Sequence, residues 1–194
     1  METIELKFSG PYAWLPGLSA PSLGEVELGT SPGIYLWTVP STVGELVYYV
    51  GETSRSFARR MDEHLAEQLS GRYRIYKPEA FLRGEKDLLW RGVYGRGAQP
   101  NVSGFVDKLP TWAPSLVEFV RSIRFHVAPT TCSDRSRRRI EAALANRLQE
   151  QKGLIGEFQE EDVRYVPRRA EEEPITVNIA WQQKPLGVPE QLEA

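Results

Sequence analysis

Two short runs of aromatic and β-branched residues, followed directly by an amphipathic segment, constrain the fold of this 194-residue chain most strongly. The runs are GIYLWTV at 33–39 and LVYYV at 46–50, and Pro40, Ser41 and Gly44 lie between them. Aromatic and β-branched residues favour strands, whereas proline, serine and glycine favour turns. The pattern predicts a β-hairpin with a long turn.

The segment after Gly51 predicts a helix that packs against this hairpin. Phe57, Met61, Leu65 and Leu69 recur every four residues, which is close to the period of an α-helix. We therefore expect these four side chains to form the buried face of the helix.

The remaining elements are expected to add strands and helices to this unit. Strands are predicted at 2–9, 123–129 and 174–181, and a helix capped by Asp134 is predicted from Arg135 to about Lys152. The order of elements predicts an α+β fold in which helices cover an antiparallel sheet. The whole chain, 1–194, is expected to form a single domain.

Two segments are expected to lie outside the core elements. Residues 72–114 mix aromatic residues, arginine and glycine without a clear period and contain several prolines, so they predict an insertion with short helices. Residues 157–173 are acidic and predict a loop. Residues 2–9 would form an N-terminal strand extension.

The formal net charge of −2 conceals a strong separation of charge along the chain. Residues 1–54 carry a charge of −5, residues 55–152 carry +8 and residues 153–194 carry −5. A cationic central block suits a polyanion such as nucleic acid, because binding releases counterions from the phosphates. The alternative is a solvated arginine-rich surface that pairs with the acidic ends.

Composition excludes several classes of protein. The sequence contains no apolar run of bilayer-spanning length and no basic segment followed by an apolar run at its N-terminus, so we expect no membrane partner and a cytoplasmic location. Cys132 is the only cysteine and rules out an intramolecular disulfide. His64 and His126 are the only histidines, too few with one cysteine for a zinc cluster of the Cys/His type.

The residues best suited to catalysis occur in a particular order along the chain. They are GIY at 33–35, YVG at 49–51, Arg60, His64, Glu141 and Asn178. The four-residue spacing of Arg60 and His64 puts both on one helix face. This set, in this order, resembles the GIY-YIG nuclease family. The resemblance is close over 33–69 and looser over 123–181.

The resemblance implies a small three-stranded antiparallel sheet flanked by helices and an endonuclease that cuts DNA with one Mg²⁺ or Mn²⁺. Tyr35 and Tyr49 would face the scissile phosphate, and one of them would act on the attacking water. Arg60 would hold the phosphate and stabilise the charge of the transition state. His64 would assist proton transfer or hold a phosphate oxygen. An arginine fork and a basic oxygen or imidazole suit phosphodiester hydrolysis.

Two further roles come from the later part of the chain. Glu141 would be the single protein ligand of the metal, which suits Mg²⁺ because this ion keeps most of its waters. Asn178 would orient the backbone or the leaving group, and Asn146 is the alternative for that role. The loop before Arg60 is one residue longer than usual, so Arg59 competes with Arg60, which we prefer because it keeps the spacing to His64.

Several further arginines are candidates for binding the nucleic-acid backbone. They are Arg55, Arg59, Arg135, Arg137, Arg138 and Arg139. The last four lie on the first turns of a predicted helix, where cations oppose the helix dipole and so do not stabilise it locally. Phosphate binding would explain them, and pairing with the acidic end of the chain is the alternative.

The sequence leaves the biological role open. It contains no recognisable zinc finger or helix-turn-helix, so the insertion at 72–114, the N-terminal segment or a dimer would have to position the DNA. A non-catalytic nucleic-acid-binding module of the same fold and an interaction protein independent of nucleic acid are the alternative functions. No nucleotide cofactor is expected, and the oligomeric state is open.

Overall fold

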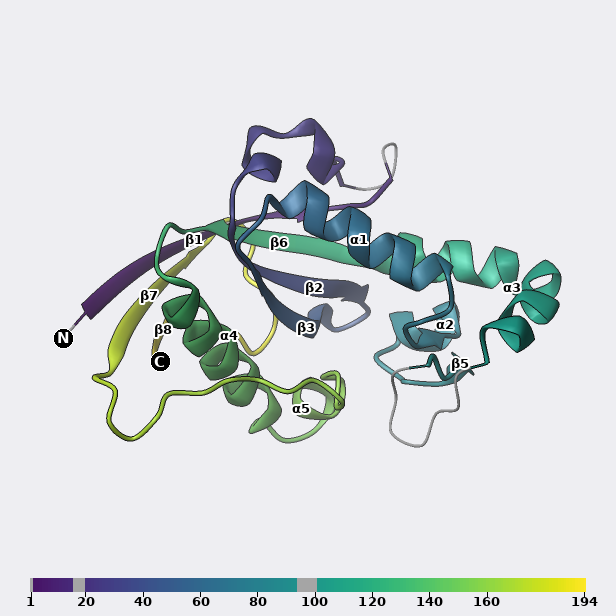
Figure 1. Cartoon of the computed structure of the whole chain (residues 1–194). Helices are drawn as coiled ribbons and strands as arrows, with labels where there is room; N and C mark the ends of the chain where they lie inside the picture. Colours follow the sequence, from purple (N-terminus) through teal and green to yellow (C-terminus); the bar gives the residue numbers. More distant parts are fainter. Residues whose placement is uncertain (1, 16–19, 94–100) are drawn as a thin grey trace.

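The computed structural model describes residues 2–15, 20–93 and 101–194. Its centre is a curved six-stranded sheet with the strand order β3-β2-β6-β1-β7-β8 (Figure 1). The strands of this sheet are β1 (Glu2–Tyr12), β2 (Gly33–Ser41), β3 (Gly44–Thr53), β6 (Arg124–Pro129), β7 (Ile175–Trp181) and β8 (Gln191–Glu193). The helices are α1 (Phe57–Leu69), α2 (Pro78–Leu82), α3 (Val102–Ser122), α4 (Asp134–Gln149) and α5 (Leu154–Glu157).

The α+β class is confirmed, but the predicted three-stranded sheet is too small. β3, β2 and β6 form the expected antiparallel unit, and β1 extends it by pairing antiparallel with β6. β7 then pairs parallel with β1, and β8 pairs antiparallel with β7. Alternate residues of β1 are buried, so this strand needs cover on one face and partners at both edges. The sheet is therefore mixed.

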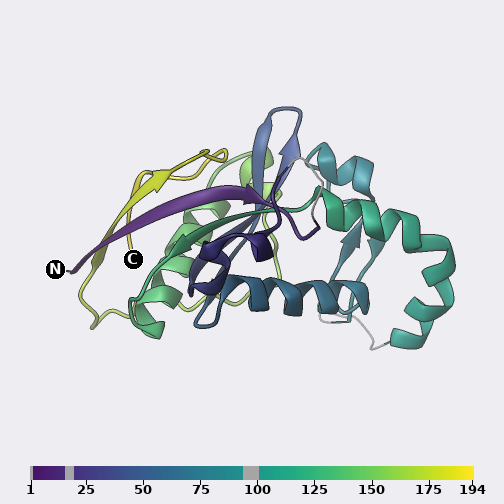
Figure 2. The ribbon, with the colours of Figure 1, turned by 90° about the horizontal axis from the view of Figure 1, so that it is seen from above.

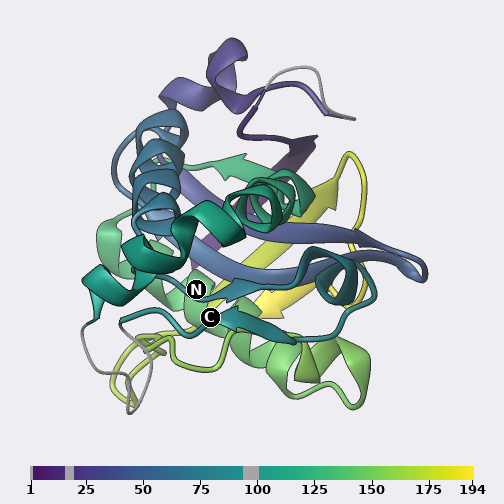
Figure 3. The same ribbon diagram turned by 90° about the vertical axis from the view of Figure 1, so that its right-hand side faces the viewer.

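The alternation of side chains along β2 divides the core into two parts. Tyr35 and Trp37 lie in one buried cluster with residues of α1, whereas Ile34 and Leu36 lie in another with residues of α4. Successive side chains of a strand point to opposite faces of its sheet. Helices α1 and α4 accordingly cover opposite faces of the sheet, as Figures 1 and 3 show.

The hairpin and its helix form largely where the sequence predicts them. Strands β2 and β3 are longer than expected, so only Thr42 and Val43 separate them and the turn is short. Helix α1 begins after Ser56, whose hydroxyl accepts a hydrogen bond from the Arg59 amide. This contact satisfies one of the free N–H groups at the start of a helix.

The buried face of α1 differs from the predicted one. Phe57 and Met61 are buried as expected, but the following buried residues are His64 and Gln68, and Leu69 is exposed. A helix has 3.6 residues per turn, so residues spaced by four drift around its axis. Two polar side chains thus take positions that the sequence pattern assigns to leucine.

The insertion is more ordered than the sequence indicates. It contains a two-stranded sheet of β4 (Ile75–Tyr76) and β5 (Leu88–Trp90), helix α2, and the first part of α3. Helix α3 continues through Pro110 and Pro114, both exposed, and it bends along its length (Figure 2). Proline removes a backbone hydrogen bond and bends a helix, but here it does not end it.

The acidic segment packs along the free edge of β3. The Gln159 side chain donates to the carbonyl of Val47 at 2.7 Å, and the Glu160 amide donates to the carbonyl of Tyr48 at 3.0 Å. These bonds satisfy edge groups that would otherwise be open to another strand. Within the ranges given above, no helix is long and apolar enough to cross a bilayer.

Candidate functional site

The side chain of Tyr35 lies over the backbone of β3 because its cross-strand partner is a glycine. Tyr35 is paired with Gly51, and a Cβ atom at Gly51 would lie 2.3 Å from Cζ of the Tyr35 ring. No side chain other than hydrogen fits at that distance. The glycine of the YVG motif therefore sets the position of the tyrosine of the GIY motif.

A chain of three side chains links the hairpin, α1 and the insertion. The Tyr35 hydroxyl is 2.8 Å from Nε2 of His64, and Nδ1 of His64 is 3.1 Å from the Tyr73 hydroxyl. Burial, reinforced by the charge of Arg60, lowers the pKa of His64 to about 3. The imidazole is therefore neutral at pH 7, with one ring nitrogen that donates and one that accepts a hydrogen bond.

Arg60 is placed beside the phenols of Tyr35 and Tyr49. Burial raises the pKa of Tyr35 to about 12, and the positive charge of Arg60 opposes this rise. Burial and the neighbouring Tyr35 also raise the pKa of Tyr49 well above its usual value. Burial alone would lower the pKa of Arg60, but the phenols outweigh it and raise the pKa.

The structure distinguishes Arg60 from Arg59. The Arg59 side chain is 71% exposed and its Nε lies 3.5 Å from Glu63, whereas the Arg60 side chain is 27% exposed and acts on Tyr35. Arg59 therefore points toward solvent, and Arg60 belongs to the phenol cluster. This placement agrees with the spacing argument for Arg60.

Glu141 reaches the same region from the opposite face of the sheet. It lies on α4, and its Oε1 accepts a hydrogen bond from the Glu52 amide of β3 at 3.1 Å. Burial, with the nearby Glu52 carboxylate, raises the pKa of Glu141 to about 7, against the effect of Arg138 and Arg60. Its negative charge in turn raises the pKa of Tyr35 and of Tyr49.

The Glu141 carboxylate thus lies at the end of β3, close enough to Tyr35, Tyr49 and Arg60 to interact with them electrostatically. A carboxylate whose ionised form is disfavoured by burial and by a second carboxylate is stabilised by a cation at that point. Across the described ranges, no group of three or more His, Cys, Asp or Glu side chains is arranged to hold a metal ion. Glu141 would act as a lone carboxylate ligand, and Mg²⁺ accepts such a site when waters and phosphates complete its shell.

The two asparagine candidates lie away from this cluster. Asn178 is on β7, and β6 and β1 separate it from β2. Its amide donates to Glu5 at 2.6 Å, and its carbonyl oxygen accepts from Gln191. Asn146 is exposed on α4. The sequence order that suggests Asn178 is not matched by proximity, because β6 and β1 lie between β7 and the hairpin.

Three of the arginines predicted to bind nucleic acid have structural partners. Arg135 contacts Glu172 with two nitrogens, the nearer at 2.5 Å. Arg137 contacts Glu52 at 3.2 Å and donates to a backbone carbonyl, and Arg139 donates to the carbonyl of Glu173. For Arg135, pairing with the acidic end of the chain, the alternative reading of the sequence, is what the structure shows.

The other three candidate arginines are more accessible. The side chains of Arg55, Arg59 and Arg138 are each exposed by more than two fifths. Arg55 and Arg59 contact Glu63, and Arg138 lies 3.7 Å from Glu52. Their positions remain compatible with contacts to a polyanion.

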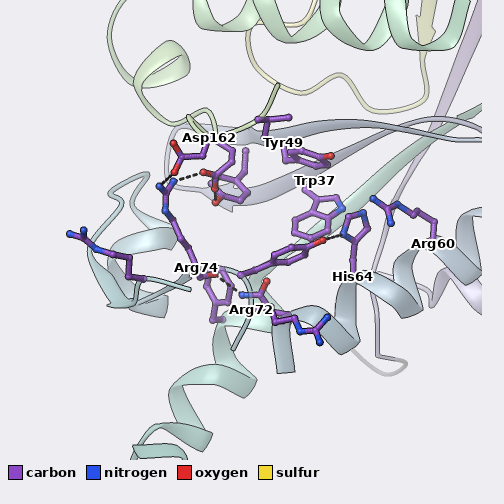
Figure 4. A pocket seen from close by; sticks show the side chains of 14 residues that line it. Trp37, Tyr49, Arg60, His64, Arg72, Arg74 and Asp162 are labelled. Carbon is purple, nitrogen blue, oxygen red and sulfur yellow. Dashed lines mark hydrogen bonds and ion pairs between the residues drawn. The ribbon is translucent and has the colours of Figure 1, made fainter. Parts of the chain in front are cut away.

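A pocket of about 300 Å³ adjoins the cluster (Figure 4). Tyr49, Arg60 and His64 line one side. The insertion contributes cations to the other side, namely Arg72, Arg74 and Arg91. The sequence analysis missed these residues and Tyr73, although RYR at 72–74 places an aromatic residue between two cations.

Comparisons with known proteins do not assign the chain to a family. None of the family models, curated proteins or solved structures compared with the chain matches it. The functional argument therefore depends on the residues and geometry described above.

Proposed function

We propose that this protein is a divalent-metal-dependent endonuclease of the GIY-YIG type that hydrolyses DNA phosphodiester bonds. One observation carries the proposal. Side chains from β2, β3, α1 and α4 meet at one end of the hairpin, although they lie far apart in the sequence. They are Tyr35, Tyr49, Arg60, His64 and Glu141, and each of them interacts with at least one of the others.

Arg60 supplies the positive charge that this reaction requires. Hydrolysis of a phosphodiester builds negative charge on the non-bridging oxygens in the transition state, and a preorganised guanidinium stabilises that charge. Partial burial of Arg60 between the phenols and the pocket strengthens the interaction, because the local dielectric constant is lower than in water. We assign the phosphate-binding role to Arg60.

His64 fixes the position of the Tyr35 hydroxyl. In the tautomer whose Nδ1–H donates to Tyr73, the neutral imidazole accepts a hydrogen bond from the Tyr35 hydroxyl at Nε2. Because the pKa of Tyr35 is raised to about 12 and that of His64 is lowered to about 3, the proton stays on the phenol. Tyr49, which lines the pocket, would orient the attacking water, whose proton would pass to solvent.

Glu141 is the residue that would hold the metal. Its carboxylate carries no ion pair within 4 Å among the described residues, and it accepts one backbone hydrogen bond that fixes its orientation. A bound Mg²⁺ or Mn²⁺ would supply charge neutralisation at the phosphate and lower the pKa of a coordinated water. A lone carboxylate fits such an ion where waters and phosphate oxygens complete its coordination shell.

Nicking of supercoiled plasmid tests the proposal. We expect nicking with Mg²⁺ or Mn²⁺, no nicking in excess chelator, and no nicking by Glu141→Ala with either metal. Glu150→Ala is the matched control, because Glu150 is exposed at the end of the same helix. Activity that persists in chelator would contradict the metal mechanism, and normal turnover by Glu141→Ala would remove Glu141 from it.

DNA binding without cleavage would favour the alternative of a non-catalytic binding module. Affinity for the DNA backbone falls steeply as salt increases, so a salt titration separates that outcome from an absence of binding. Loss of both activities at low salt would contradict any role with DNA.

A further inference from the structure

The pocket beside the cluster has two walls of different origin. Tyr49 and His64 belong to the catalytic hairpin and helix, whereas Tyr73 and Arg91 belong to the insertion and Val163 belongs to the acidic segment. The pocket opens directly beside the residues proposed to act on the phosphate (Figure 4). A group bound there would be the nearest neighbour of the reacting phosphate.

Much of the pocket lining is aromatic. Tyr49 and Tyr73 are half-buried and line it, together with the buried rings of Trp37, Tyr48 and Phe119. A phosphate does not need aromatic surfaces, but a nucleobase stacks on them, whatever its identity. The volume of about 300 Å³ is at the lower end of pockets that bind small organic ligands, which suits one base.

A buried amide adds a polar group to the lining. Gln68 is 1% exposed, and its Nε2 donates to the carbonyl of Arg74 at 2.7 Å. Its side-chain carbonyl oxygen accepts no hydrogen bond from the described residues and belongs to a pocket-lining side chain. An amide oxygen in such a place is suited to accept an N–H of a base.

Cations at the pocket suit the phosphates that flank a base. Arg74 is neutralised by Glu160 and Asp162. Arg91 is exposed and forms no ion pair with the part of the chain that the structure describes. Arg60 and Arg91 both belong to the lining and add positive charge to it.

We infer that this pocket receives a single DNA base displaced from the helical stack, next to the phosphate that is cut. The inference rests on the proposed nuclease function and names its substrate class: DNA with an unpaired or bulged nucleotide. Removing a base from the stack costs least where that base is already unpaired. The insertion thereby gives the site a preference for DNA structure, because it supplies one wall of the pocket.

Binding measured in chelator tests the inference without requiring cleavage. Two fluorescein-labelled duplexes of equal length are compared by anisotropy, one fully paired and one with a single extra unpaired nucleotide at its centre. We expect about tenfold tighter binding of the bulged duplex, which is about 1.4 kcal/mol and within the range of one base–aromatic stack. Equal affinities would overturn the inference.

A substitution that fills the pocket tests its location. Val163→Trp adds a large side chain to the lining from a segment outside the catalytic cluster, and Val166→Trp places the same side chain three residues further on, at an exposed position that does not line the pocket. We expect Val163→Trp to bind both duplexes equally and Val166→Trp to keep the preference. An unchanged preference in Val163→Trp would overturn the inference.

Two further measurements separate the possible failures. Val163→Phe, a smaller addition, replaces Val163→Trp if thermal unfolding shows that the tryptophan variant is not folded. Cleavage with Mg²⁺ is then assayed on both duplexes. A binding preference without any cleavage supports the pocket and contradicts the nuclease proposal, whereas cleavage without a preference contradicts the pocket alone.

Discussion

Helices α1 and α4 cover opposite faces of one sheet and use arginine in opposite ways. On α4, Arg135, Arg137 and Arg139 contact carboxylates or backbone carbonyls of other segments and hold the chain together. On α1, Arg60 lies beside phenols and a pocket. The density of arginine in the sequence is higher on α4, so density alone does not locate a binding surface.

The buried faces of the two helices also differ, because that of α4 is aliphatic and that of α1 includes polar side chains. Helix α4 packs on aliphatic side chains such as Ile34 and Leu36, and its own Leu144 is fully buried. Helix α1 packs on aromatic rings and buries His64 and Gln68. Aliphatic packing stabilises the fold without directional contacts, whereas buried polar groups need partners in fixed places. The buried face of α1 is therefore packed less uniformly than that of α4, but it holds polar side chains in fixed positions.

The largest expected effect that tests this comparison is on cleavage. Arg60→Ala should lower the rate about 10²–10³-fold, the usual cost of removing one preorganised charge-stabilising donor. Arg59→Ala should change it little, because that side chain is 71% exposed. Plasmid nicking at saturating DNA measures both. The reverse ranking would transfer the role to Arg59 and break the comparison.

The next effect is on stability and belongs to the α4 face. Leu144→Ala should lower the free energy of unfolding by about 2–5 kcal/mol, because it leaves a cavity in the aliphatic core. Leu69→Ala, at a position of α1 that is 46% exposed, should cost less than about 0.5 kcal/mol. Denaturant titration measures both variants. Similar losses would contradict the burial of Leu144 and the exposure of Leu69.

The titration of Glu141 gives a smaller effect with a defined sign. Its pKa is raised to about 7 from the ordinary value of 4.5, so the ionised form destabilises the fold and wild-type stability falls as pH rises from 4.5 to 7. Glu141→Gln has no carboxylate to ionise and does not lose this stability. Above pH 7 the variant should therefore be more stable than the wild-type protein by about 1–3 kcal/mol, because one pKa unit corresponds to about 1.4 kcal/mol.

Urea titrations of both proteins at pH 4.5 and pH 8 measure this difference. The exposed Glu150→Gln serves as the control and should show no such change with pH. A difference for Glu141→Gln that is equal at the two pH values would contradict the raised pKa.

The smallest effect concerns the exposed arginines. Arg138→Ala should weaken DNA binding a few-fold and reduce the slope of log affinity against log salt by about 1, as expected for the loss of one phosphate contact. Arg135→Ala should leave the slope unchanged, because its guanidinium is engaged by Glu172. A larger change for Arg135→Ala would show that Arg135 contacts DNA despite its ion pair with Glu172.

Local elements were predictable where the pattern is short and periodic. The hairpin, the helix that follows it, and the four-residue relation of Arg60 to His64 are all encoded by neighbouring residues. The prolines of residues 72–114 predicted only short helices there, because proline usually ends a helix, but helix α3 continues through two of them. Packing of Phe105, Leu116 and Phe119 against the core keeps the longer helix intact.

Contacts between distant segments were harder to predict from the sequence. The sequence indicates Glu141 only because it matches the order of residues in the motif. The same order indicates Asn178, which two strands of the sheet separate from the hairpin. Tyr73 was missed because its partner, His64, is on another element. Sequence order carries no distance, so one of the two later residues joins the cluster and the other does not.

The sequence by itself determined the α+β class, the aromatic hairpin with its following helix, and the residue types of the proposed site, because propensity and periodicity act over a few neighbours. Only the tertiary structure decided which residues meet. It extended the sheet to six strands, assigned the arginines of α4 to carboxylates and carbonyls, and joined the insertion to the pocket. Such pairings depend on long-range packing, in which each group finds its partner by position in space and not along the chain.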